Sequence, residues 1–67
     1  MINYNKLSPR EREIALLVTT GVTNKQVARQ LAISEKTVRN ILTNVFAKTG
    51  VESRTELAVQ LVRAGYA

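Results

Sequence analysis

Residues 23–40 read TNKQVARQLAISEKTVRN and contain two helix starts, one at Thr23 and one at Ser34. Thr23 is followed three places later by Gln26, the spacing of a capping box, in which each side chain bonds the backbone N–H of the other residue. The short helix that begins there leads into a tight turn with apolar Ile33 at its centre, and Ser34 caps a longer helix. This order matches the plan of a helix-turn-helix motif, whose second helix enters the major groove of DNA, although helical hairpins with short turns also occur in proteins that do not bind DNA.

Similar helix-capping motifs occur before and after this stretch of the sequence. SPRE at residues 8–11 predicts a helix start with proline at the first helical position. SRTE at residues 53–56 is a further capping box and predicts a fourth helix over about residues 54–64. No segment alternates with the two-residue period of a strand. We therefore expect one all-α domain over residues 1–67, a four-helix domain in which helices 2 and 3 form a helix-turn-helix motif at about residues 24–43.

The longer helix, SEKTVRNILTNVFAKTG at residues 34–50, has two unlike sides when its residues are spaced roughly 100° apart. One side is apolar and is expected to be buried; it carries Val38, Leu42, Val45 and Thr49. The other side carries no acid apart from Glu35 in the first turn. Its residue types suit base edges, because Arg can bond a guanine edge bidentately, Asn can bond an adenine edge, and Thr can donate, accept or contact a thymine methyl. The candidate base-facing residues are Lys36, Arg39, Asn40, Thr43 and Asn44.

The amino-acid composition excludes several classes of protein and of binding site. The 67 residues include no Cys and no His, so neither a disulfide scaffold nor a Cys/His zinc site is available, and no cofactor is expected. No pair of nucleophile and base can be proposed either, so we do not expect an enzyme. The net charge is +5, and five basic residues against Glu35 place +4 of it within residues 23–49. Such a concentration favours a polyanionic partner, with a solvated basic face as the alternative.

The sequence predicts neither a signal peptide nor a membrane span. The start, MINY at residues 1–4, lacks the charged and long apolar regions of a signal peptide. The longest apolar run, residues 14–18, is too short to cross a bilayer. We expect a cytoplasmic protein with no membrane partner.

Four stretches resemble the LuxR-type (GerE-like) family of bacterial DNA-binding domains, in the order and spacing of that family. They are LSPREREI at residues 7–14, GVTNKQVARQLAISEKTVRN at 21–40, AKTGV at 47–51 and SRTELAVQL at 53–61. The resemblance implies a domain that binds double-stranded DNA as a dimer and regulates transcription, alone or at the C-terminus of a response regulator or quorum sensor. It also implies that helix 3 reads the major groove, with Arg39, Asn40 and Thr43 facing the bases.

The resemblance further implies contacts with the DNA backbone, and by position Lys36 matches such a contact as well as lying on the polar side of helix 3. Two positions depart from the family pattern: Ile41 stands where His is common, at a groove-edge contact, and Ala47 where Lys or Arg is common, at a phosphate contact. The candidate phosphate-contacting residues are Thr23, Asn24, Lys25, Ser34, Thr37 and Lys48.

The fourth expected helix has two apolar patches, although a monomer needs only one. Leu57, Leu61 and Ala64 form a stripe that would face the domain. The second patch is the candidate dimerisation surface and consists of Thr55, Ala58, Val59 and Val62. A cover formed by the N-terminal segment around Ile2 and Tyr4 is the alternative.

Two rival functions stay open on the sequence. The promoter-reading region 4 of sigma factors has a similar ERE opening and S..TV start, but it normally ends soon after its recognition helix. A basic helical adaptor that binds a protein partner is the other rival; a strong apolar groove or an acid-paired third helix would have favoured it, and the sequence indicates neither. The expected partners are double-stranded DNA, a second copy of the chain bound through helix 4, and RNA polymerase.

Overall fold

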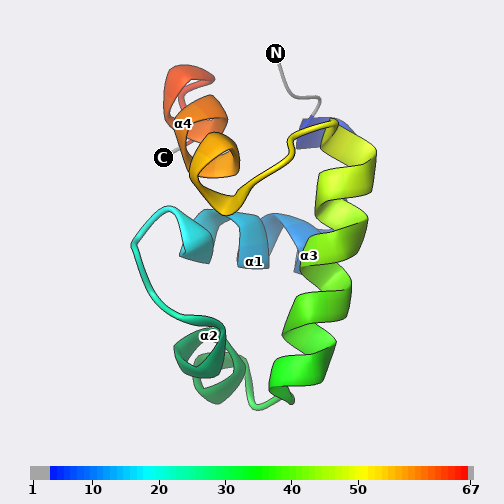
Figure 1. The fold of residues 1–67 in the computed structure, drawn as a ribbon, viewed down its shortest axis with the longest axis vertical. Helices are drawn as coiled ribbons and strands as arrows, with labels where there is room; N and C mark the ends of the chain where they lie inside the picture. The colour runs from blue at the N-terminus through cyan, green and yellow to red at the C-terminus, as the bar shows by residue number, and fades with distance from the viewer. Residues whose placement is uncertain (1–3, 67) are drawn as a thin grey trace.

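The computed structural model describes residues 4–66, which form a short 3-10 helix and four α-helices (Figure 1). The elements are η1 (Tyr4–Lys6), α1 (Pro9–Val18), α2 (Asn24–Leu31), α3 (Glu35–Thr49) and α4 (Arg54–Arg63). No strand occurs among these residues, and the predicted all-α fold with α2 and α3 as a helix-turn-helix is confirmed.

The capping boxes predicted for α1 and α2 are both present. Ser8 Oγ accepts a hydrogen bond from the N–H of Glu11 at 3.2 Å, and Glu11 Oε1 accepts one from the N–H of Ser8 at 2.8 Å. Thr23 and Gln26 form the same reciprocal pair at 3.1 and 2.8 Å. Each pair satisfies backbone N–H groups that the first turn of a helix leaves without partners.

The full capping box predicted for α4 is only half formed, so the prediction is wrong for one of its two hydrogen bonds. Ser53 Oγ accepts from the N–H of Glu56 at 3.1 Å, as expected. The Glu56 carboxylate, however, accepts from the N–H of Glu52 at 3.1 Å and not from that of Ser53. Ser53 has a φ of −147°, against −68° at Ser8, and this more extended backbone directs the Ser53 N–H away from Glu56.

The turn between α2 and α3 is made without glycine. Ala32 adopts the left-handed conformation, with φ 57° and ψ 42°, and is the only non-glycine residue with positive φ in the described part of the chain. The N–H of Ile33 then donates to the carbonyl of Ala28 at 3.0 Å, which closes the end of α2. Ile33 is half-buried against the core, so this apolar side chain anchors the turn between the two helices.

The hydrophobic core lies around α1, which packs against α2, α3 and α4 (Figure 1). In Figure 1, α1 runs across the middle of the molecule, α3 stands beside it, and α2 and α4 lie at opposite ends. The expected inward side of α3 is confirmed for Val38 and Val45, which are fully buried, and for Leu42, which is nearly so, whereas Thr49 is half-buried. The fully buried side chains from the other helices include Ile14, Val27, Leu57 and Leu61.

Aromatic stacking joins the two ends of the described chain. The rings of Tyr4 and Tyr66 stack with centroids 4.1 Å apart and an interplanar angle of 17°. Tyr4 Oη donates to the carbonyl of Arg12 at 3.3 Å, and the Arg12 guanidinium lies 5.7 Å from the centroid of the same ring. Burial raises the pKa of the Tyr4 hydroxyl. Ile2, the other residue of the expected N-terminal cover, lies outside the described residues.

Candidate nucleic-acid interface

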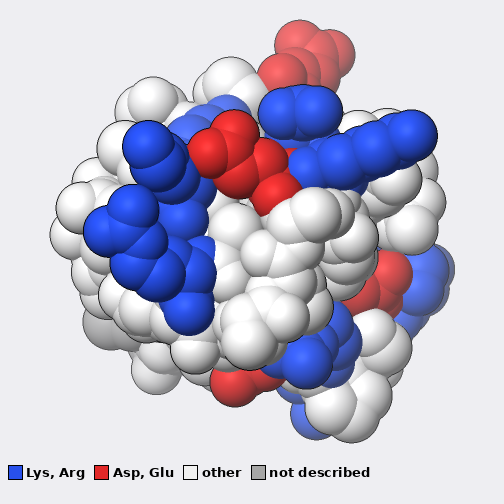
Figure 2. Space-filling view, turned by 90° about the horizontal axis from the view of Figure 1, so that it is seen from below, with Lys and Arg blue, Asp and Glu red and all other residues white. Residues whose placement is uncertain are grey.

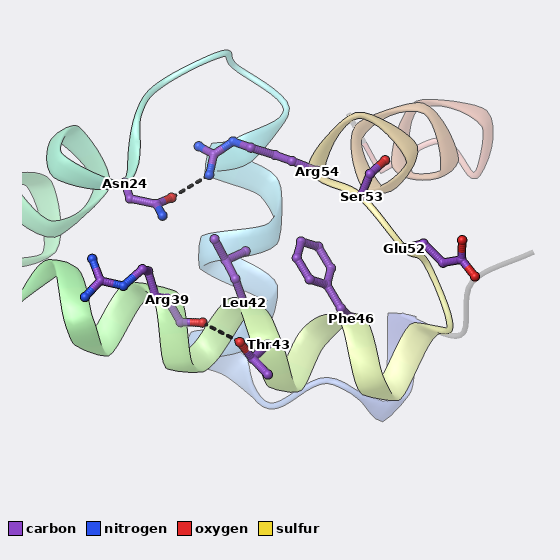
Figure 3. Close-up of a pocket in the computed structure, with 8 residues that line it drawn as sticks. All are labelled: Asn24, Arg39, Leu42, Thr43, Phe46, Glu52, Ser53 and Arg54. Carbon is purple, nitrogen blue, oxygen red and sulfur yellow. Dashed lines mark hydrogen bonds between the residues drawn. The ribbon is translucent and has the colours of Figure 1, made fainter.

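The outward side of α3 is exposed along its whole length. Packing of the opposite side onto α1 and α2 fixes this orientation. One hydroxyl on the exposed side is held by the helix itself, since Thr43 Oγ1 donates to the carbonyl of Arg39 at 3.0 Å (Figure 3). Because its proton is engaged, this hydroxyl can offer a partner only its acceptor lone pairs. The structure exposes all five candidate base-facing residues: Lys36, Arg39, Asn40, Thr43 and Asn44.

Two of the candidate phosphate-contacting side chains form the cap of α3. Ser34 Oγ accepts from the N–H of Thr37 at 3.0 Å, and the two hydroxyls lie 2.9 Å apart. Both residues are exposed, so the hydroxyl pair sits at the positive end of the helix dipole and is open to solvent.

The start of α2 brings three further candidates together. Lys25 and Thr23 are exposed, although the Thr23 hydroxyl is engaged in its capping box. Asn24 is half-buried, and its side-chain oxygen accepts a hydrogen bond from Arg54 at the start of α4 (Figure 3). Arg54 also donates to the backbone carbonyl of Val22.

Sequence reasoning missed Arg54 because its partners lie 30 and 32 residues away. The only local signal was its place in the SRTE capping motif, which explains Ser53 and Glu56 but not an arginine.

Lys48 has an intramolecular partner that the sequence did not reveal. Its Nζ lies 2.8 Å from Oε1 of Glu11 on α1, 37 residues away. The Glu11 side chain is buried, whereas that of Lys48 is 44% exposed. The hydrogen bond from Lys48, followed by that from the backbone N–H of Ser8, lowers the pKa of the Glu11 carboxyl. This ion pair joins the C-terminal end of α3 to the start of α1.

A groove of about 430 Å³ runs beside the outward side of α3 (Figure 3). Leu42 and Phe46 form its apolar floor, and Arg39 and Arg54 lie along its edges. The remaining lining residues come from α2, α3 and the segment before α4: Asn24, Thr43, Glu52 and Ser53.

The end of the molecule formed by α2 and the first turns of α3 carries several basic groups around its rim (Figure 2). Figure 2 shows this end, with groups of Lys and Arg side chains on several sides of a mostly uncharged centre and acidic side chains beside some of them. In the described part of the chain, no group of three side chains is placed to hold a metal ion. No helix there is long and apolar enough to span a membrane.

The second apolar patch of α4 is open to solvent. Val59 is 42% exposed and Val62 is 57% exposed, beside exposed Thr55 and half-buried Ala58. Leu57, from the other stripe of the same helix, is fully buried. The N-terminal segment therefore leaves both valines uncovered where the structure describes it.

Comparison with known proteins matches residues 5–61 to the family described as bacterial regulatory proteins, luxR family (GerE). The spore germination protein GerE of Bacillus subtilis is 46% identical over 59 residues, which cover 88% of this chain and 80% of that protein. The monoamine regulon transcriptional regulator of Klebsiella aerogenes is 55% identical over 51 residues, covering 76% of this chain and 22% of that protein. The DNA-binding transcriptional activator DevR/DosR of Mycobacterium tuberculosis is 43% identical over 53 residues, covering 79% and 24%.

Several of the curated relatives are far longer than this chain, which spans 7% of the length of one HTH-type transcriptional regulator of Mycobacterium tuberculosis. The family match nevertheless covers most of the chain and all four α-helices except the last two residues of α4. It confirms the resemblance seen in the sequence and the expectation that the chain is not an enzyme. It also decides against the sigma-factor alternative. The chain belongs to the luxR family of bacterial regulatory proteins.

Proposed function

We propose that this domain binds double-stranded DNA in a sequence-specific manner and regulates bacterial transcription, with α3 lying in the major groove. The observation that carries the proposal is the outward side of α3. It exposes Arg39, Asn40 and Thr43, and its only acid, Glu35, lies in the first turn. A solvated helix usually mixes acids and bases to gain salt bridges, whereas side chains that bond base edges need no such partners.

The roles of the side chains follow from their positions. Arg39 and Asn40 are exposed on successive residues of α3 and offer the two bidentate pairings available to protein side chains, with guanine and with adenine. Lys25 at the start of α2 is the simplest phosphate contact, because it is exposed and has no intramolecular partner among residues 4–66. Phosphate contacts position a protein on DNA without reading its sequence.

Dimerisation through α4 is the second part of the proposal. Val59 and Val62 expose apolar surface on the side of α4 opposite to buried Leu57. A two-fold axis through this patch would set two copies of α3 on half-sites about one helical turn apart, and the operator would be roughly palindromic. The same proposal includes a place in a response regulator, action in the cytoplasm and contact with RNA polymerase.

The direct test is selection of bound sequences from random duplex DNA. We expect enrichment of a motif with two related half-sites, and a steep loss of affinity with salt as counterions are released from the phosphates. A protein-binding adaptor would enrich no sequence. Unchanged affinity between low and physiological salt would also contradict the proposal, since a basic surface that contacts phosphates cannot escape that dependence.

A further inference from the structure

Arg54 crosses from the start of α4 to the start of α2. One terminal nitrogen of its guanidinium donates to the side-chain oxygen of Asn24 (Figure 3). The other donates to the carbonyl of Val22. The two acceptors lie on either side of Thr23, which caps α2. A single side chain therefore holds both the incoming backbone and the first residue of this helix.

The contact determines which way the Asn24 amide faces. A guanidinium has donors only, so the group of Asn24 that faces it must be the carbonyl oxygen. The amide nitrogen, which carries two donor hydrogens, then points away from Arg54, toward the side of the groove formed by α3 (Figure 3). Among residues 4–66 no group accepts a hydrogen bond from this nitrogen.

We propose that Arg54 is a positioning residue for DNA binding, which turns the amide donors of Asn24 toward a phosphate oxygen of the DNA backbone. The inference rests on the proposed function. It assigns to α4, a helix otherwise expected to serve dimerisation, a part in the phosphate contacts at the start of α2. A free asparagine side chain presents its oxygen or its nitrogen with similar ease, and an oxygen would be repelled by a phosphate.

A double-mutant cycle in DNA affinity tests the coupling. Arg54→Lys keeps the charge but lacks the planar fork that holds two acceptors. We expect it to weaken binding to operator and to random duplex alike by about threefold to tenfold, the usual worth of one hydrogen bond. In an Asn24→Ala background, Arg54→Lys should have no further effect. Equal losses in both backgrounds would show that Arg54 supports the fold only and would overturn the inference.

A second variant keeps the contact with Arg54 and removes the donor. In Asn24→Asp the carboxylate still accepts from the guanidinium, so the melting temperature should not fall, but an acceptor with a negative charge replaces the amide donors. The matched control is Gln26→Glu, which adds the same charge two residues away and preserves the capping box. We expect Asn24→Asp to weaken DNA binding at least tenfold more than Gln26→Glu. Equal effects of the two variants would contradict the inference.

The outcome separates the inference from the proposed function. If the unaltered domain binds operator DNA and the effects of Arg54→Lys and Asn24→Ala simply add, the positioning role fails and the proposed function stands. If the unaltered domain binds no duplex DNA, both fail.

Discussion

Two lysines that were both expected to contact phosphate have different surroundings, and these decide how readily each can bind DNA. Lys25 and Lys48 were both expected to contact phosphate, yet Lys48 is paired with the buried carboxylate of Glu11, while Lys25 extends from the start of α2 into solvent. A phosphate that approached Lys48 would compete with Glu11 for the same ammonium group. The two lysines are thus expected to contribute unequally to DNA binding, although residue type and charge are the same.

Arg39 and Asn40 should determine base preference. Arg39→Ala and Asn40→Ala should each remove about 1–3 kcal/mol of discrimination at particular base pairs, because a bidentate pairing is lost while binding to random DNA is largely kept. Lys25→Ala is the matched control, and it should weaken operator and random DNA alike. The measurement is the affinity of each variant for a library of operator variants. An intact base preference profile in both variants would show that this side of α3 does not read sequence.

Glu11 should make the stability of the fold depend on pH. The hydrogen bonds from Lys48 and Ser8 place its folded-state pKa below the ordinary value of 4.5, so its contribution is present above about pH 4.5 and is lost as the pH falls through the folded-state pKa. Glu11→Gln should therefore be less stable than the unaltered domain at pH 7, and the difference should shrink in acid. Urea unfolding at several pH values measures it.

The control for this prediction is Glu13→Gln. The carboxylate of Glu13 lies 3.0 Å from Arg10, and both side chains are about half exposed. Exposed ion pairs contribute little to stability. A Glu13→Gln effect as large as that of Glu11→Gln would contradict the role given to the pair of Glu11 and Lys48.

At the scale of the elements, the turn between α2 and α3 sets the geometry of the motif. Every α-helix begins at a Ser or Thr whose side chain accepts from the third residue of the helix. The turn that ends α2 lacks such a favourable residue, because Ala32 adopts the left-handed conformation, which is unfavourable for a residue with a Cβ atom. The unfavourable conformation of Ala32 therefore lowers the stability of the domain at the turn that sets the angle between α2 and α3.

Replacing Ala32 with glycine should stabilise the domain by about 0.5–1 kcal/mol, because glycine adopts the left-handed conformation without steric cost. Ala47→Gly is the matched control: Ala47 is exposed within regular helix in α3, and the same change should destabilise by about 1 kcal/mol. Thermal or urea unfolding measures both. Shifts of the same sign in the two variants would show that the backbone strain at Ala32 is not significant.

At the scale of the whole domain, the packing of the helices around α1 leaves two surfaces exposed. α1 packs against the other three α-helices, so the outward side of α3 and the second patch of α4 are both left open. Leu42→Ala, which alters the core beneath α3, should cost roughly 2–5 kcal/mol of stability. Changes on the two outer surfaces should cost little, since surface substitutions usually alter stability by less than about 0.5 kcal/mol.

The α4 patch should be needed for pairing on DNA. Val62→Glu places a charge in the proposed dimer contact, where its burial would be unfavourable. Affinity for an operator with two half-sites should fall by about tenfold or more, while affinity for a single half-site should fall only by the general effect of one added negative charge. Equal losses on the two DNAs would contradict a dimer formed through this patch. Sedimentation of the complexes gives an independent measure of the number of copies bound.

The sequence alone determined the helices and most of the residues that face inward or outward. This was possible because caps and the 3.6-residue period are local: Thr23 with Gln26, or Val38 with Leu42 and Val45, interact within one or two turns of a helix. The same period predicted which side of α3 faces outward, and the resemblance to a known family added the expectation that this side reads DNA. The left-handed conformation of Ala32 was not predicted from the sequence, because no glycine stands at the turn to indicate it.

Only the tertiary structure decided which polar side chains are engaged by distant partners. Arg54 with Asn24, Lys48 with Glu11, and Tyr4 with Tyr66 are separated by 30, 37 and 62 residues, and nothing near either member of a pair indicates the other. Such contacts form only once the helices pack around α1 and bring their ends together. They decide which side chains stay open to a partner, because a donor or acceptor already satisfied within the fold has less to gain from another bond.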